Sequence, residues 1–225
     1  MPLTAPAPSC GLRPAAPEPD VVTRLVDLVA DGDALSRAEA LLTPAELARA
    51  RRGTPAVHRR RVLLRAALRT ALAAELGTTP DRVPLTATAA GRPQLPAATG
   101  LDASCSASGA LGVVAVGRGC RVGVDVQQVA PWTPDVLDEG WLAGSERAAL
   151  LHLPVTARAI AVTRAWTQKE AVLKARGTGL RDDPATTVTA VGRAEGVVAG
   201  WAVRDVPVPD GWVAGLAAAR NEETP

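Results

Sequence analysis

The chain has 225 residues, a formal net charge of +2 and 47% hydrophobic residues. It is long enough to bury its own core, and composition gives no indication of a nucleic-acid-binding protein. Three scattered cysteines, Cys10, Cys105 and Cys120, exclude a disulfide framework or a cysteine zinc site. No apolar run reaches membrane-spanning length. We therefore expect a cytoplasmic protein with no membrane or nucleic-acid partner.

The first half of the chain predicts one strand, several helices and then further strands. Residues 1–19, rich in Pro and Ala, have no basic start followed by an apolar run, so they predict a flexible leader and not a secretory signal. Thr43, Pro44 and Glu46 form the pattern of a helix start with a capping box. The remaining segments predict a strand at 21–33, helices at 34–42, 42–52 and 57–77, a loop with a short strand at 78–96, and two strands at 111–129.

The second half repeats this order of elements. A strand at 121–129 is followed by a helix start at 141–151, a long helix at 157–177 and two strand-rich segments, 196–203 and 211–219. A shift of the chain by 100 residues aligns Leu42 with Leu142, Glu46 with Glu146, Gly77 with Gly177 and Thr78 with Thr178, and few other positions match. The matching order predicts an α+β fold made of a pseudo-twofold pair of similar halves, at 20–118 and 119–225. A ligand cleft is expected between the halves.

Both lysines of the chain lie in the long second-half helix, whereas the other 23 of the 25 basic residues are arginines. On a helical projection Lys169 falls within the apolar arc, and Glu170 lies at its edge with Lys174 one turn further on. Glu170 and Lys174 form either a surface pair at i,i+4 or part of a site. Lys169 needs a partner or a path to water, so it either extends to solvent or lines the cleft with Glu170.

The strand "RVGVDVQQV" places Asp125 and Gln127 side by side on one face, because side chains alternate along a strand. This face is either the hydrated side of a half-buried strand or part of a metal site. Carboxylates, phosphate oxygens and water are the ligands that Mg²⁺ prefers. Asp125 together with Glu170 from the helix would supply two of them.

A third feature is basic. Arginines crowd the first long helix, Arg60 among them, and Arg92 lies in "AGRPQLP". They form a solvated face or clamp phosphates. The segment "ASCSASG", with Ser104, Cys105 and Ser106, offers hydroxyl and backbone N–H groups for a possible phosphate loop.

Taken in order, these motifs resemble the 4′-phosphopantetheinyl transferases, in particular the larger two-halved type that activates peptide and polyketide synthases. The family's W-x-x-K-E-A-x-x-K helix is matched in full by Trp166, Lys169, Glu170, Ala171 and Lys174. "RVGVDVQQV" resembles its G-[VI]-D-[VI]-E strand, "AGRPQLP" its G-[KR]-P-x-L segment and "LLTPAELARARR" its first-half helix start. "ASCSASG" stands in the place of its S-H-S loop.

The resemblance implies roles for particular residues. Asp125, Gln127 and Glu170 would hold Mg²⁺ against the pyrophosphate of coenzyme A. Glu170 would take the proton of the attacking serine, and Lys174 would contact the phosphate. The other coenzyme A-binding residues would be Arg60, Arg92, Ser104, Cys105, Ser106 and Lys169.

Two positions depart from the family's pattern. Its strand Glu is Gln127 here, which removes one negative charge, and its loop His is Cys105 here, which removes a contact to the 3′-phosphate. The expected function is Mg²⁺-dependent transfer of the 4′-phosphopantetheine arm of coenzyme A to a serine of an apo acyl or peptidyl carrier protein, by a monomer, with release of 3′,5′-ADP. The alternatives are a non-catalytic homologue that binds coenzyme A or a carrier, and an arginine-rich module that binds nucleic acid.

Overall fold

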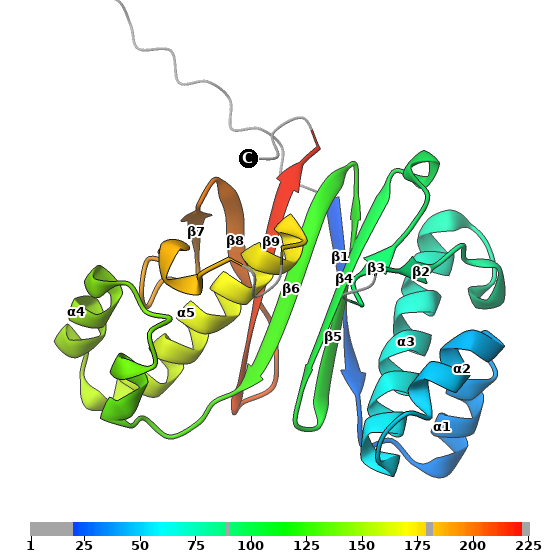
Figure 1. The fold of residues 1–225 in the computed structure, drawn as a ribbon, viewed down its shortest axis with the longest axis horizontal. Coiled ribbons are helices and arrows are strands. Elements are labelled where there is room, and N and C mark those ends of the chain that lie inside the picture. Colours follow the sequence, from blue (N-terminus) through cyan, green and yellow to red (C-terminus); the bar gives the residue numbers. More distant parts are fainter. Residues whose placement is uncertain (1–19, 89–90, 179–181, 222–225) are drawn as a thin grey trace, which may run out of the picture.

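The fold is α+β, as predicted (Figure 1). The computed structural model describes residues 20–88, 91–178 and 182–221, and the leader expected at 1–19 lies outside them. The helices of the described part are α1 (Gly32–Glu39), α2 (Pro44–Ala50), α3 (Pro55–Leu76), α4 (Gly144–His152) and α5 (Val155–Arg176), with short 3₁₀ turns η1 (Pro80–Arg82), η2 (Ala97–Thr99), η3 (Pro134–Asp138) and η5 (Pro184–Thr186). Among these described helices, none combines the length and the apolar character that a membrane crossing requires.

The described strands form antiparallel sheets. Their bounds are β1 (Asp20–Asp27), β2 (Thr86–Ala87), β3 (Pro93–Gln94), β4 (Leu101–Ser108), β5 (Leu111–Arg118), β6 (Cys120–Gln128), β7 (Glu195–Val198), β8 (Trp201–Val206) and β9 (Trp212–Arg220). One sheet has the order β1-β5-β4 and another the order β6-β9-β8-β7, and β2 pairs with β3. The predicted turn between two strands near Gly119 falls where β5 ends and β6 begins, and Gly119 adopts a positive φ of 64°.

The two halves repeat one topology. In each half a strand leads through helices to one long helix and then to an antiparallel pair whose last strand lies in the centre: β1-β5-β4 in the first half corresponds to β6-β9-β8 in the second. In Figure 1 the strands of both sheets lie in the middle, with α1 to α3 covering one outer side and α4 and α5 the other. This arrangement agrees with the predicted pseudo-twofold pair of halves.

Capping residues in the sequence set the start of α3 and the ends of α3 and α5. Thr54 accepts the N–H of Val57 at the start of α3, and Pro55 occupies its first position. Gly77 and Gly177 end α3 and α5 in the left-handed conformation, with φ of 63° and 81°, which a residue without Cβ adopts at little cost. The helix boundaries predicted at these two glycines are confirmed.

A core lies between the two sheets. Val113 and Ala115 of β5 pack against the valines of β6, while Val114 and Val116 point to the other face of β5, into the core beneath α3. Successive residues of a strand face opposite sides. β5 therefore contributes side chains both to the core between the two sheets and to the core beneath α3.

One expectation is wrong. The segment "ASCSASG" lies almost entirely within β4 and is not a phosphate loop, since its residues pair along their length with β5. Alternation consequently separates Cys105, which packs toward α3, from Ser104 and Ser106, which face β6.

Candidate active site between the two halves

The site lies where α5 crosses β6, and Gly123 sets the distance between them. A Cβ at Gly123 would overlap the carbonyl oxygen of Ala171 and lie 2.5 Å from the backbone nitrogen of Ala175. A larger residue would therefore push the helix away from the strand. With glycine here, the residue two positions further along the strand, Asp125, comes within reach of α5.

Asp125 is buried and is surrounded by donors. Its Oδ1 accepts from Nζ of Lys174 at 2.6 Å and from Oγ of Ser106 at 2.6 Å, and its Oδ2 accepts from Nε2 of Gln127 at 3.2 Å. Lys174 also donates to the carbonyl of Val124 at 3.2 Å. Asp125 is only 2% exposed, so this carboxylate is held in one orientation by three different elements, β4, β6 and α5.

Glu170 lies one turn before Lys174 on α5. Burial raises the pKa of Glu170, Lys174 opposes that effect, and the negative charge of Asp125 raises the pKa further. Its Oε1 is buried and meets no hydrogen-bond partner among the described residues. A buried carboxylate oxygen without a donor is unfavourable unless a cation or a proton satisfies it.

The donor set fits a divalent cation only in part. The described residues contain no group of three His, Cys, Asp or Glu side chains that could hold a metal ion. Asp125 and Glu170 bring two carboxylates, and Oε1 of Glu170, which has no partner within residues 20–88, 91–178 and 182–221, could bind a cation. Gln127, expected as a third ligand, instead donates its amide N–H to Asp125. Further ligands must therefore come from a bound substrate and water.

A row of polar side chains on β4 satisfies the free edge of β6. Asp102 Oδ2 accepts the N–H of Val122 at 2.9 Å, and Ser104 Oγ accepts the N–H of Val124 at 3.1 Å. Ser108 Oγ accepts the N–H of Gln128 at 3.0 Å. These bonds replace backbone pairing between the two sheets. Ser104 is thus occupied with the joint between the halves, and Ser106 contacts the site through Asp125.

Arg92 lies elsewhere than expected. Its guanidinium donates to Oδ2 of Asp102 at 2.6 Å, to the carbonyl of Val122 at 3.3 Å, and to the carbonyl of Lys174. Arg121 makes a similar contact, with the carbonyl of Ala175 at 2.9 Å. Both arginines cap the C-terminal end of α5, where cations are favourable. Arg92 therefore joins the first half to α5, and a phosphate would have to compete with these partners.

Lys169 is also placed differently from the expectation. It is fully buried, and its Nζ donates to Oε2 of Glu146 at 2.7 Å and to the carbonyls of Pro184 and Thr187 at 2.9 and 2.8 Å. An ammonium has three N–H donors, and all three have acceptors. Burial lowers the pKa of Lys169, although Glu146 opposes this effect. We therefore remove Lys169 from the residues expected to bind coenzyme A.

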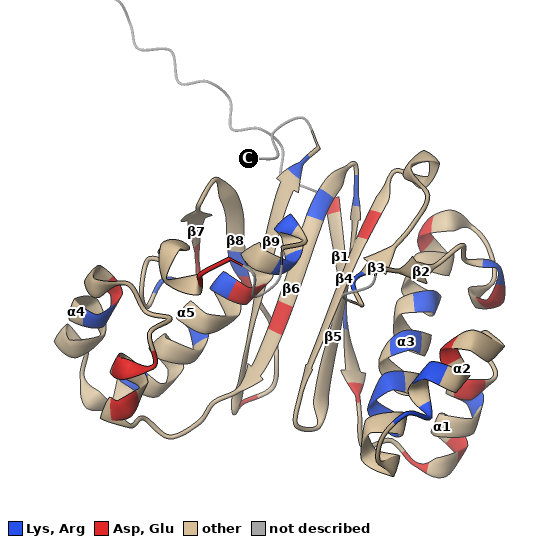
Figure 2. Ribbon diagram, in the orientation of Figure 1, with Lys and Arg blue, Asp and Glu red and all other residues tan. Residues whose placement is uncertain are grey.

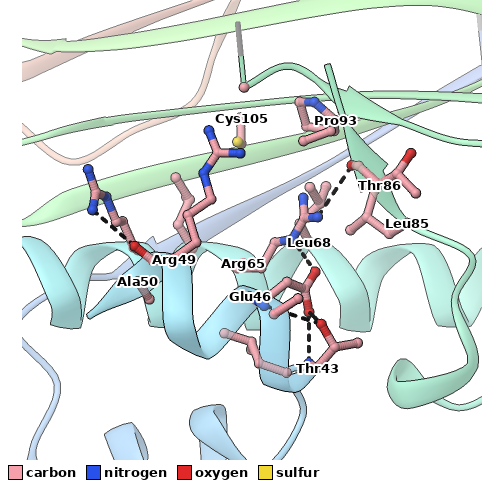
Figure 3. Close-up of a pocket in the computed structure, with 16 residues that line it drawn as sticks. Thr43, Glu46, Arg49, Ala50, Arg65, Leu68, Leu85, Thr86, Pro93 and Cys105 are labelled. Carbon is pink, nitrogen blue, oxygen red and sulfur yellow. Dashed lines mark hydrogen bonds and ion pairs between the residues drawn. The ribbon is translucent and has the colours of Figure 1, made fainter. Parts of the chain in front are cut away.

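A cavity of about 560 Å³ lies in the first half, between α2, α3 and β4. Cys105 lines it, and Figure 3 shows Arg49 extending from α2 toward Cys105 while Arg65 pairs with Glu46. Burial raises the pKa of the Cys105 thiol, so at neutral pH this thiol is an uncharged wall of the cavity. Figure 2 shows several basic residues along α3. Arg60, exposed on this helix, donates to the carbonyl of Ala107 at 2.9 Å.

A second cavity, of about 340 Å³, lies in the second half beside Gln127. Trp132, Trp141 and Trp166 line it, and the rings of Trp141 and Trp166 meet edge to face with centroids 5.0 Å apart. We expected one cleft between the halves. The structure places these two cavities one in each half. Cys105, on the face of β4 opposite Ser106, lines the first cavity, and Gln127, bonded to Asp125, lines the second.

Several of these residues escaped the sequence analysis. Arg49 lies in a short helix with no motif beyond its cap. Trp132 and Trp141 lie in or beside a segment without periodicity. The concentration of three of the five tryptophans within 35 residues nevertheless indicates an apolar cluster in this part of the chain. Glu146 had a clear signal in its alignment with Glu46 at a shift of 100 residues.

Comparison with known proteins supports the resemblance over part of the chain. Residues 121–196 match the sequence model of the 4′-phosphopantetheinyl transferase superfamily. This range includes Asp125, Glu146, Glu170 and Lys174. No curated protein sequence matches the chain. The match supports phosphopantetheinyl transfer in general terms and lies within the half that contains both carboxylates.

Proposed function

We propose that this protein is a 4′-phosphopantetheinyl transferase of the larger two-halved type. It would transfer the 4′-phosphopantetheine arm of coenzyme A to a serine of an apo acyl or peptidyl carrier protein, as a monomer. The observation that supports this most is the cluster of Asp125, Glu170 and Lys174, in which a buried carboxylate oxygen meets no donor from the described part of the chain. It lies inside the region that matches the superfamily.

The reaction is a displacement at phosphorus. The serine oxygen of the carrier forms a bond to the β-phosphorus of coenzyme A, the bond from that phosphorus to the bridging oxygen breaks, and 3′,5′-ADP leaves with the electron pair. Glu170 accepts the serine proton, because a carboxylate with a raised pKa is a better base. Lys174 stabilises the negative charge that develops on the phosphate oxygens.

Asp125 and Glu170 would hold Mg²⁺ together with the pyrophosphate of coenzyme A. When bound, Mg²⁺ would supply Lewis-acid stabilisation of the phosphate charge. Gln127 orients Asp125 through its amide N–H, and it remains a candidate ligand through its carbonyl oxygen. In this proposal Ser106 likewise keeps Asp125 aimed at the site.

The two cavities fit the two ends of coenzyme A. The first-half cavity, lined by Arg49, Arg61 and Arg65 and by Cys105, suits the phosphorylated nucleoside because arginine binds phosphate through paired N–H groups. Arg60, beside it, would contribute from the rim. The tryptophan-lined cavity beside Gln127 suits the less polar pantetheine arm.

The test uses the full chain with coenzyme A, Mg²⁺ and a panel of apo carrier proteins, followed by intact-mass measurement of each carrier. We expect one or more carriers to gain the phosphopantetheine mass, and no gain with Asp125→Ala. If coenzyme A binds but no carrier gains mass, the protein is a non-catalytic binder and the proposal is wrong.

A further inference from the structure

Each half contains a carboxylate, at the third position of a helix, that is bonded to a buried cation. In the first half the carboxylate is Glu46, the third residue of α2, whose Oε2 accepts from the N–H of Thr43 and from Nε of Arg69, at 2.9 and 2.8 Å. Arg69 is 1% exposed, and its Nη1 donates to the carbonyls of Pro80 and Val83. The cation therefore ties α3 to the cap of α2 and to the segment C-terminal to α3.

The second half repeats this arrangement 100 residues later. Glu146 is the third residue of α4, and its Oε2 accepts from the N–H of Ala143 and from Nζ of Lys169, at 2.8 and 2.7 Å. Lys169 donates to the carbonyls of Pro184 and Thr187. Both tied segments begin with a proline at the start of a 3₁₀ turn, η1 in one half and η5 in the other. We call each arrangement a brace: Glu46–Arg69 in the first half and Glu146–Lys169 in the second.

The two braces have different neighbours on their helices. In the first half the next residue is Thr70, whose hydroxyl bonds within α3 to Ala66, and the position four residues beyond it is Ala74. In the second half the corresponding residues are Glu170 and Lys174. The positions that follow the first brace therefore have no ionisable side chain, whereas the same positions after its duplicate supply Glu170 and Lys174.

We propose that Lys169 is a positioning residue, which fixes the rotation of α5 and thereby holds Glu170 and Lys174 against Asp125. This inference rests on the proposed function. Successive helical residues are rotated by about 100°, so the direction of Lys169 sets that of Glu170. Lys169 is bonded to α4 and to the chain around η5, whereas Gly123 sets the separation of α5 from β6.

The first-half brace provides a control, because Arg69→Met removes a buried cation from α3, a helix that contributes neither a carboxylate nor a lysine to the cluster of Asp125, Glu170 and Lys174. The variants are Lys169→Met, Lys169→Arg and Arg69→Met in the full chain. For each we would measure Tm, kcat and KM for coenzyme A in carrier modification, and Mg²⁺ affinity by calorimetry in the presence of coenzyme A.

We expect both methionine variants to lower Tm. Lys169→Met leaves the buried carboxylate of Glu146 without its cation, and Arg69→Met removes one of the two arginines that pair with Glu46. Lys169→Met should lower kcat by roughly 10- to 100-fold, the scale of a small misplacement of reacting groups, and should weaken Mg²⁺ binding with little change in KM for coenzyme A. Arg69→Met should leave kcat and Mg²⁺ affinity unchanged. Lys169→Arg should restore part of both Tm and kcat, since arginine fills the equivalent place in the first half.

Equal kcat values for the two methionine variants would overturn the positioning role and leave a purely structural one. If Lys169→Met does not fold, Glu146→Gln, which keeps the shape of the brace and removes its charge, replaces it with the same expected loss of kcat. A wild-type chain that transfers nothing would refute the proposed function. The Mg²⁺ titrations would then still decide whether Lys169 positions the two carboxylates, and unchanged Mg²⁺ affinity in the variants would overturn it.

Discussion

The two lysines of the chain have different tasks. Lys169 uses all three N–H groups on buried acceptors, while Lys174 is 26% exposed and makes two bonds, to Asp125 and Val124. Of its three donors, Lys174 thus has one that no described residue accepts and that a ligand could use. A compact ammonium on a flexible stem is able to follow a phosphate oxygen as charge develops, whereas the planar guanidinium of arginine presents its donors in a fixed fork.

We predict that Lys174→Arg lowers kcat by about tenfold or more and leaves Tm nearly unchanged. The larger guanidinium would keep the positive charge but could not place a single donor between Oδ1 of Asp125 and a phosphate oxygen. Steady-state kinetics at saturating coenzyme A provide the measurement. Arg176→Lys, two residues further on, is the control, since the contact of Arg176 within the described part of the chain is a weak approach to Asp182, at 4.0 Å. Wild-type turnover in Lys174→Arg would show that any cation suffices.

Glu170 predicts a conflict between stability and activity. Its pKa is raised in the folded protein, chiefly by burial. At a pH above the ordinary carboxyl pKa, the ionised form of Glu170 therefore destabilises the folded state. The stability that the protonated form provides is present at acidic pH and is lost as the pH rises through the raised pKa. We expect Glu170→Gln to increase the free energy of unfolding at neutral pH by on the order of 1 kcal/mol, the scale of an unpaired buried polar group, and to abolish transfer.

Denaturant unfolding of Glu170→Gln and wild type at several pH values checks this. The stability difference should be small below the ordinary carboxyl pKa of 4.5 and should grow toward neutral pH. A difference that shrinks with rising pH would mean that the folded protein favours the ionised carboxylate even without ligands.

At the scale of elements, the packing of α5 on the second sheet depends on glycine. A Cβ at Gly215 of β9 would lie 3.0 Å from the carbonyl of Thr167, and the contact at Gly123 is tighter still. Both neighbours are helix backbone, which cannot move aside as a side chain can. The helix therefore lies unusually close to β6 and β9, and the short approach lets Lys174 reach Asp125.

We predict that Gly123→Ala destabilises the protein by about 1–3 kcal/mol, the usual range for overpacking in a core, and lowers kcat more than Tm alone would suggest. The added methyl group would separate α5 from β6 and so part Lys174 from Asp125. Gly144→Ala is the control, because a Cβ there meets nothing within 4 Å. Thermal unfolding and carrier modification measure the two effects. A Gly123→Ala variant with the wild-type Tm would contradict the close packing.

The elements that sequence predicted well were those specified by local chemistry. The capping box of Thr43 and Glu46 and the glycine stop at Gly177 depend on neighbouring residues alone. β4 was missed because its polar positions, Asp102, Ser104 and Ser108, have no reason to lie in a strand until the free edge of β6 is placed beside them. Similarly, the partner of Lys169 lies 23 residues away, so periodicity placed its side chain correctly inward but could not identify the acceptor that it meets.

At the scale of the whole molecule, the first half contributes the side chains that join the two halves and the arginine-lined cavity. The second half contributes Asp125 and Glu170. Arg92 and the polar row of β4 join the two halves through side chains, without a shared backbone ladder. Sequence alone indicated the duplication through the order of elements. It could not show that the joint passes through Ser106 to Asp125, because that contact exists only once the halves are packed.

The same joint predicts that metal and coenzyme A bind cooperatively. Asp125 and Glu170 repel one another, as the raised pKa of Glu170 reflects in part, and Lys174 and Ser106 already occupy Oδ1 of Asp125. Two carboxylates with their donors make a weak site for Mg²⁺, since this ion prefers near-octahedral coordination by oxygens. The pyrophosphate of coenzyme A would supply the missing oxygens and would draw the free N–H of Lys174 toward itself.

We therefore expect the affinity for Mg²⁺ to rise at least about tenfold when coenzyme A is present, and the affinity for coenzyme A to rise by the same factor with Mg²⁺, because such coupling is reciprocal. Calorimetric titrations in both orders measure this coupling.

Gln127→Glu should strengthen Mg²⁺ binding to the free protein by adding a third carboxylate, and it should reduce the coupling between Mg²⁺ and coenzyme A. Gln128→Glu, at an exposed neighbouring position, should change neither. Equal Mg²⁺ affinities with and without coenzyme A would show that the two ligands do not share the site formed by Asp125 and Glu170.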